Sequence, residues 1–265
     1  GIQGPAHGRL PLGPGSSLRY GRDDEGLSQW GSPTPIDPAP AQSDFQPPHP
    51  PEALPLLRTG AFLKIGVMAP AVMVADVWIA QRLFPGFDAG AQFISELGGP
   101  AAPMPAVFNI GMVIAGIAGL FAGAGFTHAL EHAGGRRVVS AFAGLFVALT
   151  GLGAVFAGIF HWPDPMHRAC GVGLAIQFAP LFTAWALWGK PEHRRLANFS
   201  LGWFLGLLLV FALLTGVWNV RTGHDVGYWQ RGHAFLGLLW LAIAAWTLER
   251  NWRRTFVGEL ESASA

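Results

Sequence analysis

Charged residues are scarce in this chain of 265 residues. Asp, Glu, Lys and Arg make up 12% of it and hydrophobic residues 51%, whereas soluble domains carry about 25% charged residues. With so few charges, much of the protein surface must face an environment other than water. The net charge of +1 also gives no strong field for binding nucleic acid, so we expect no nucleic-acid partner.

Cysteine is nearly absent, because Cys170 is the only one in the chain. A single cysteine excludes an internal disulfide and any metal centre built from several thiolates.

Residues 1–60 differ from the rest of the chain in their proline content. They hold 12 of the 21 prolines, and proline can neither continue a helix nor donate a backbone hydrogen bond in a sheet. Few large apolar side chains lie between these prolines. We therefore expect residues 1–60 to form a disordered tail with partly polyproline-like backbone.

From residue 61 onward, long apolar runs replace the prolines. A helix needs about 20 apolar residues to cross the hydrocarbon of a bilayer. Six runs qualify, the last of them with help from flanking interfacial residues: 61–83, 105–127, 138–160, 169–188, 199–218 and 234–248. The sequence therefore predicts an all-α, polytopic membrane bundle of six transmembrane helices over 61–250, followed by a cytoplasmic C-terminal tail over 251–265.

Lys and Arg gather on one side of the predicted bundle. Nine fall on the side that holds both termini and four on the other, and cytoplasmic segments carry the basic excess in membrane proteins. We therefore expect a multi-pass protein of the cell membrane with both termini in the cytoplasm. Tryptophans mark the two interfaces. They are Trp185, Trp188, Trp246 and Trp252 on the cytoplasmic side, and Trp78, Trp162, Trp218 and Trp229 on the outer side.

Small residues recur every four positions on two of the predicted helices. The second carries Gly111, Ala115, Gly119 and Gly123, and the fifth carries Gly202 and Gly206. Small residues at this spacing let helix backbones approach closely in lipid. They predict either helix contacts inside one chain, which we favour, or a dimer face.

Titratable residues concentrate in three segments predicted to lie on the outer face. These segments read PGFDAGAQFISELGGPAAP, HWPDPMHR and NVRTGHDVGYWQRGH. The candidate site residues in them are, in chain order, Ser95, Glu96, His161, Asp164, His167, Arg231 and His233.

Four of these residues have side chains that ligate metals. His161, Asp164 and His167 follow one another at intervals of three, and His233 begins the last predicted helix on the same side. Imidazoles with a carboxylate suit a divalent ion such as zinc, which would activate water for hydrolysis. The alternative is a plain tight turn, since Asp164 lies between two prolines and suits local hydrogen bonding.

A catalytic interpretation adds Ser95, Glu96 and Arg231 to Asp164 and His167. Asp164 would orient His167, and Arg231 would hold a phosphate or carboxylate headgroup. We expect Glu96, Asp164, His167 and Arg231 to lie together. A salt-bridge network that fixes the loops predicts the same grouping.

Asp76 lies near the outer end of the first predicted helix. An acidic residue in an apolar span is costly and is usually paired or functional. A salt bridge to an arginine of the outer segments is the alternative to a functional role.

The sequences ISELGGPAAP, GIFHWPDPMHR and GYWQRGH, in this order, resemble the DUF998 family of uncharacterised six-helix prokaryotic membrane proteins. The resemblance covers about 61–250. It implies family-like positions at Ser95, Glu96, Leu97, Gly98, Asp164, His167 and Arg231. His161 departs from the proline that many members have there. The family implies no established activity.

Three classes of function remain open. The first is a membrane enzyme, such as a metal-assisted lipid hydrolase with its site on the outer face. The second is a non-enzymatic accessory or assembly protein, and the third is a small-solute transporter. The expected partners are the lipid bilayer and a lipid or small-molecule ligand.

The predicted topology is tested with cysteines introduced at Gly134 and Asp164. We expect an impermeant thiol reagent applied to intact cells to label position 164 and not position 134, because basic residues flank position 134. The unmodified chain, which contains Cys170, is the control. Labelling at 134 alone would reverse the orientation.

Overall fold

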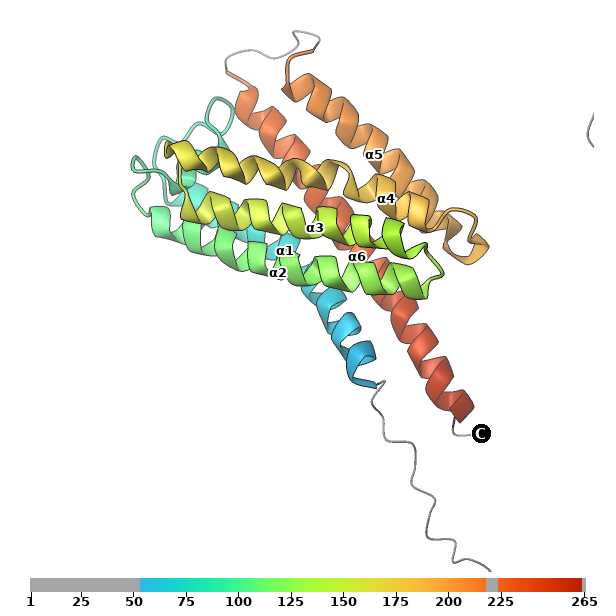
Figure 1. Cartoon of the computed structure of the whole chain (residues 1–265). Helices are drawn as coiled ribbons and strands as arrows, with labels where there is room; N and C mark the ends of the chain where they lie inside the picture. Colours follow the sequence, from blue (N-terminus) through green and yellow to red (C-terminus); the bar gives the residue numbers. More distant parts are fainter. Residues whose placement is uncertain (1–52, 218–223, 264–265) are drawn as a thin grey trace, which may run out of the picture. The chain divides into compact units, whose positions relative to one another are not determined.

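The computed structural model describes residues 53–217 and 224–263, with side chains over 58–217 and 224–255. Residues 1–52 of the tail predicted over 1–60 lie outside the described residues. Helices dominate the described chain, which contains no strand (Figure 1). In chain order the elements are α1 (Ala53–Arg82), η2 (Ile94–Gly98), α2 (Pro105–His132), α3 (Arg137–Ile159), η3 (Pro165–Gln177), α4 (Ala179–Ala186), η4 (Pro191–His193), α5 (Arg194–Leu214) and α6 (Val226–Ala263).

Within the described residues, six helical segments are long and apolar enough to cross a membrane. They cover 58–82, 105–132, 137–159, 165–186, 191–214 and 226–255. The prediction of an all-α bundle with six membrane helices is therefore confirmed. Large apolar side chains such as Trp78, Ile110 and Leu205 are exposed on its surface, as expected for helices that face lipid.

The six segments run back and forth between two ends of the bundle. We call one the η2 end, which carries η2, the turn over 160–164 and the start of α6. The other is the η4 end, which carries η4 and the turn over 133–136. At the η4 end, Gly134 has a φ of 78°, a left-handed conformation that glycine adopts without strain.

The fourth membrane segment differs from the regular helix that was predicted over 169–188. It begins at Pro165 as the long 3-10 helix η3 and becomes α-helical only in α4. A 3-10 helix rises about 2.0 Å per residue against 1.5 Å for an α-helix, so η3 is stretched along α3. Gly153 of α3 lies so close to Gly173 that a Cβ on Gly153 would be 2.4 Å from the Cα of Gly173.

Glycines also bring α2 and α3 together, and these two helices make the most extensive contact in the bundle (Figure 1). A Cβ on Gly123 would lie 2.5 Å from the Gly144 carbonyl oxygen, and one on Gly151 would lie 2.5 Å from the Gly116 carbonyl oxygen. The small residues of α2 thus serve contacts inside the chain. By contrast, nothing lies within 4 Å of a Cβ on Gly202 or Gly206, so this pair makes no such contact among the described residues.

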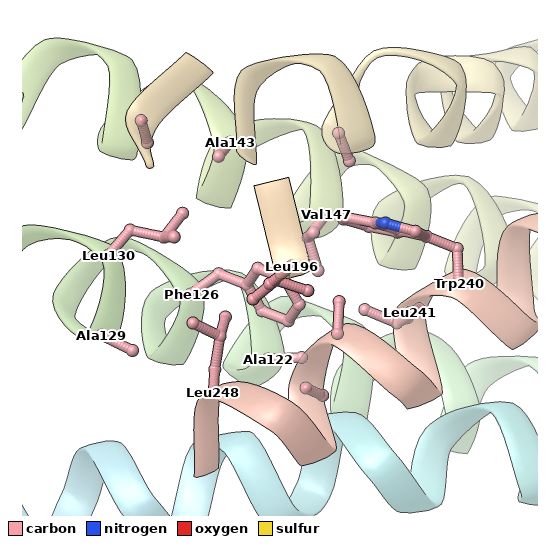
Figure 2. Close-up of a cluster of buried hydrophobic side chains, with 14 of the residues drawn as sticks. Ala122, Phe126, Ala129, Leu130, Ala143, Val147, Leu196, Trp240, Leu241 and Leu248 are labelled. Atoms are coloured by element: carbon pink, nitrogen blue, oxygen red, sulfur yellow. The ribbon is translucent and has the colours of Figure 1, made fainter. Parts of the chain in front are cut away.

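A buried apolar cluster connects α2, α3 and α6 in the half of the bundle nearer the η4 end. Figure 2 shows Phe126 and Trp240 within it, and their ring centroids are 5.8 Å apart. The Trp240 indole Nε1 donates a hydrogen bond to Ser200 Oγ at 3.1 Å. This bond satisfies the polar atom of a fully buried tryptophan and ties α6 to α5.

Two helices extend beyond the apolar runs that the sequence predicted. α1 begins at Ala53, inside the segment predicted as tail, and α6 continues to Ala263 through the predicted C-terminal tail. The apolar run stops at Leu248, but the following residues contain no proline and favour helix. Glu249 also bonds Arg253 at 2.7 Å, one turn later, and lies 3.9 Å from Lys64 of α1. Charge therefore ended the apolar run without ending the helix.

The close approach of α2 and α3 predicts different effects for two glycine substitutions. Gly151→Ala should lower the melting temperature in detergent, because the new methyl group overlaps the α2 backbone and overpacking costs about 1–3 kcal/mol. Gly202→Ala is the matched control on α5 and should not lower it, because the added methyl group meets open space. Equal melting temperatures for the two variants would contradict the described packing.

Candidate functional site

The loop after α1 is bound to the first turn of α6. The Gly227 amide donates to the Gly90 carbonyl oxygen at 2.6 Å, and the Ile94 amide donates to Gln230 Oε1 at 2.8 Å. A Cβ on Gly227 would lie 2.4 Å from the carbonyl oxygens of Ala89 and Gln92. Only glycine at position 227 lets the helix approach the loop this closely.

Arg231 of α6 also binds the loop after α1. It is only 7% exposed, and its Nη1 donates to the carbonyl oxygens of Ala89, Gln92 and Gly227 at 2.8–3.0 Å. The guanidinium also lies 5.3 Å from the centroid of the Phe87 ring, within cation–π range. Arg231 therefore holds the loop on α6 through Nη1, while its buried Nε and Nη2 have no hydrogen-bond partner among the described residues.

Glu96 stabilises η2 and forms no ion pair with Arg231 among the described residues. Its Oε1 accepts from the Phe93 amide at 2.8 Å, and its Oε2 accepts from Gln92 Nε2 at 3.0 Å. Glu96 thus finds the backbone donor that a half-buried carboxylate requires.

The turn before η3 separates two predicted partners. Asp164 accepts from the Met166 amide at 2.7 Å and caps η3, as the tight-turn alternative predicts. His167 Nδ1 instead bonds the Phe160 carbonyl oxygen at 2.5 Å. Because a carbonyl oxygen only accepts, Nδ1 carries the proton and Nε2 presents its lone pair. The prediction that the Asp164 carboxylate orients His167 is therefore wrong.

A cavity of about 510 Å³ opens beside these elements, and we call it the η2 cavity. Its polar lining comes from η2, α3, η3, the end of α5 and α6, and consists of Ser95, Thr150, His167, Cys170, Thr215, Gln230 and His233. Most other lining residues are apolar, among them Met73, Phe108, Met112, Ile176 and Leu238. None of the described residues that line it carries a formal charge.

Two buried histidines face this cavity. His167 is 8% exposed and His233 is 4% exposed. His167 Nε2 lies 3.6 Å from Cys170 Sγ, and His233 Nε2 lies 3.0 Å from Gln177 Oε1. With an amide oxygen as the acceptor, His233 donates through Nε2 and keeps its Nδ1 lone pair. His167 therefore contacts the protein through both ring nitrogens, whereas His233 is held through Nε2.

The structure does not bring the four predicted metal ligands together. His161 and Asp164 are exposed, whereas His167 and His233 are buried. Among the described residues, no group of three or more His, Cys, Asp and Glu side chains could hold a metal ion. The cause is local, because the turn that carries His161 and Asp164 points them outward while η3 carries His167 into the bundle.

Asp76 lies against Gly111 of α2 and is 7% exposed. Its Oδ2 is buried and has no hydrogen-bond partner within the described part of the chain. The predicted salt bridge to an arginine of the outer segments is absent among the residues that the structure describes. Asp76 does not line the η2 cavity.

The sequence identified Ser95, His167 and His233 as candidate site residues, and all three line the η2 cavity. Gln230 and Cys170 also line it but were not identified from the sequence. Gln230 lies inside the GYWQRGH motif, and its role was hidden because an amide side chain carries no charge. Cys170 was considered only as evidence against a disulfide and a thiolate metal centre. Its spacing of three residues from His167 is the signal that would have paired them.

The fold and this cavity define a six-helix integral membrane protein with a mostly apolar cavity near one end. A family model described as "Protein of unknown function (DUF998)" matches residues 67–247, a range that contains every residue of the cavity lining. The chain therefore belongs to the DUF998 family, as its motifs indicated. No curated protein and no solved structure matches it.

The hydrogen bonds of Arg231 predict its effect on stability. Arg231→Met should leave three carbonyl oxygens without their donor, and a bond from a charged donor contributes about 1.5–3 kcal/mol. We expect a lower melting temperature in detergent and faster hydrogen exchange over residues 88–98. Arg168→Met, at an exposed position of the same end, is the control. Unchanged exchange in Arg231→Met would show that the loop is held by other contacts.

Proposed function

We propose that this protein binds an uncharged, lipid-like molecule in the η2 cavity. The observation that carries the proposal is the lining itself, which joins two buried histidines to a mostly apolar wall without a charged side chain among the described residues. Apolar pockets with a few convergent polar groups are typical small-molecule sites, and volumes of about 300–1,000 Å³ are usual for them.

The absence of charge in the described lining favours a neutral ligand. Moving an ion from water into such a cavity is costly unless an opposite charge or a strong hydrogen-bond network receives it. A hydroxyl or carbonyl group needs only one or two partners. Ser95 and Gln230 offer both donors and acceptors, and His167 Nε2 can accept from a ligand hydroxyl in place of the Cys170 thiol.

The wall formed by η3 supports entry from the bilayer. Leu174 lines the cavity and is 44% exposed. Gly171 is exposed as well, and a Cβ there would meet nothing within 4 Å. A lipid-like molecule thus needs to displace little to reach the cavity. This argues for a lipophile over the polar solute of a small-solute transporter.

Hydrolysis of the bound lipid is a second candidate, favoured by the contact between His167 and Cys170. His167 Nε2 would take the thiol proton, and the thiolate would attack an ester carbonyl. The alcohol would leave with that proton, and water would cleave the thioester to release a fatty acid and restore the thiol. This route needs only residues that line the cavity.

The binding proposal is tested with two photoactivatable probes that share one acyl chain, a monoacylglycerol and its phosphate ester. In detergent, we expect the neutral probe to crosslink to η3 and to residues 226–238 of α6 about tenfold more strongly than the anionic probe, which is the effect of about 1.4 kcal/mol. Ala154→Trp fills the cavity and should abolish the crosslink. Ala141→Trp, on the exposed face of the same helix, should preserve it.

Equal labelling by both probes, or equal loss in both tryptophan variants, would contradict the proposal. The same reactions also test hydrolysis. Fatty acid release that Cys170→Ala abolishes, with crosslinking retained, would establish the enzyme, whereas crosslinking without release would leave binding as the function.

A further inference from the structure

A second cavity lies at the opposite end of the bundle and has a different lining. It measures about 560 Å³, and we call it the basic pocket. Three elements contribute to it: the C-terminal end of α2, the connection from α4 to α5, and α6. Its side chains include His132, Lys190, His193, Asn251 and Arg254, with Glu192 as the one carboxylate among the described lining residues.

Two cations of this pocket have no carboxylate partner. Among the described residues, neither Lys190 nor Arg254 lies within 4.0 Å of an acidic oxygen, whereas Lys64, Arg137 and Arg253 at the same end each do. The Lys190 side chain instead lies against Gly134, where a Cβ would be 2.9 Å from Nζ. The pocket therefore holds positive charge that the described side chains leave unpaired.

A third group in the pocket lacks a partner. His193 Nδ1 is buried and makes no hydrogen bond among the described residues. A buried polar nitrogen without a partner costs free energy. Asn251 adds an amide from α6 that can donate or accept. Two cations, an imidazole and an amide thus line one space.

A neighbouring groove of about 420 Å³ shares Lys190 with the basic pocket. Its lining includes Leu187, Trp188, Ala197 and Arg194. Trp188 is 68% exposed, and Trp246 of α6, near the same end, is 53% exposed. Exposed tryptophans of membrane helices gather at the level of the lipid headgroups, so the two cavities meet at that level. The basic pocket is lined by polar side chains, whereas the groove is lined in part by the apolar side chains of Leu187, Trp188 and Ala197.

We propose that the basic pocket binds the phosphate of an anionic phospholipid, with the rest of the lipid along the neighbouring groove. Lys190 and Arg254 supply the positive charge, and His193 and Asn251 supply further hydrogen bonds. Basic pockets between membrane helices are known to receive anionic headgroups. This site is independent of the η2 cavity, because it lies at the other end of the helices and takes a charged group.

The test follows the melting temperature of the full chain in detergent as lipid is added, since a ligand that binds the folded state raises it. We expect dioleoyl phosphatidylglycerol to act at a concentration about tenfold lower than dioleoyl phosphatidylcholine. Raising the KCl concentration about tenfold should weaken the phosphatidylglycerol effect, because exposed charges are screened. No preference for phosphatidylglycerol would overturn the proposal.

Two matched double variants test whether the phosphatidylglycerol effect depends on the basic pocket. Lys190→Gln combined with Arg254→Gln should shift the phosphatidylglycerol midpoint about tenfold and leave the phosphatidylcholine response unchanged. Arg136→Gln combined with Arg195→Gln removes the same charge at the same end, from exposed positions outside the pocket, and should leave both responses unchanged. If both double variants lost the phosphatidylglycerol preference equally, general positive charge at this end would be its cause, and the proposed pocket would be contradicted.

A single variant and two soluble phosphates complete the experiment. If the double variant fails to fold, Lys190→Gln alone should still weaken phosphatidylglycerol, because Lys190 borders both cavities. Glycerol 3-phosphate and inorganic phosphate are the soluble probes. Stabilisation by either at the concentration that suffices for phosphatidylglycerol would show that the ligand is a soluble phosphate, which would overturn the lipid assignment.

Discussion

The η2 end of this protein depends on one buried guanidinium. Arg231 Nη1 donates to carbonyl oxygens of the loop after α1 and of the first turn of α6, so a single group joins the first and last membrane helices. The absence of a side chain at Gly227 makes the short distance possible. This contact also places Gln230 and His233, on either side of Arg231, along the wall of the η2 cavity.

The cavities at the two ends of the bundle differ in the charge of their linings. At the η2 end, the carboxylates of Asp88, Glu96 and Asp164 accept hydrogen bonds from their own loops, and the described lining of the cavity stays neutral. At the η4 end, Lys190 and Arg254 face a pocket without a carboxylate partner in the described chain. A neutral lipophile and a phosphate headgroup are the ligands that these two linings favour.

The candidate site was only partly predictable from the sequence. His167 and His233 were both identified, and the structure brings them to one cavity. His161 and Asp164 were assigned to the same site because they share a membrane side and a regular spacing. Spacing predicts a shared face only within a regular helix, and the prolines beside Asp164 interrupt that regularity. The sequence therefore identified a segment that reaches the cavity, but it did not determine which of its side chains point inward.

The membrane helices were determined by the sequence itself. Lipid offers no hydrogen bonds to the backbone, so an apolar run of sufficient length must form a helix whatever its neighbours are. The sequence did not determine the 3-10 form of η3, the continuation of α6 past Leu248, or the neutral partners of Glu96. These depend on which backbone atoms approach one another across the bundle. Tertiary packing alone decides that, because contacts such as Gly153 with Gly173 and Gly227 with Gly90 join elements that no local pattern connects.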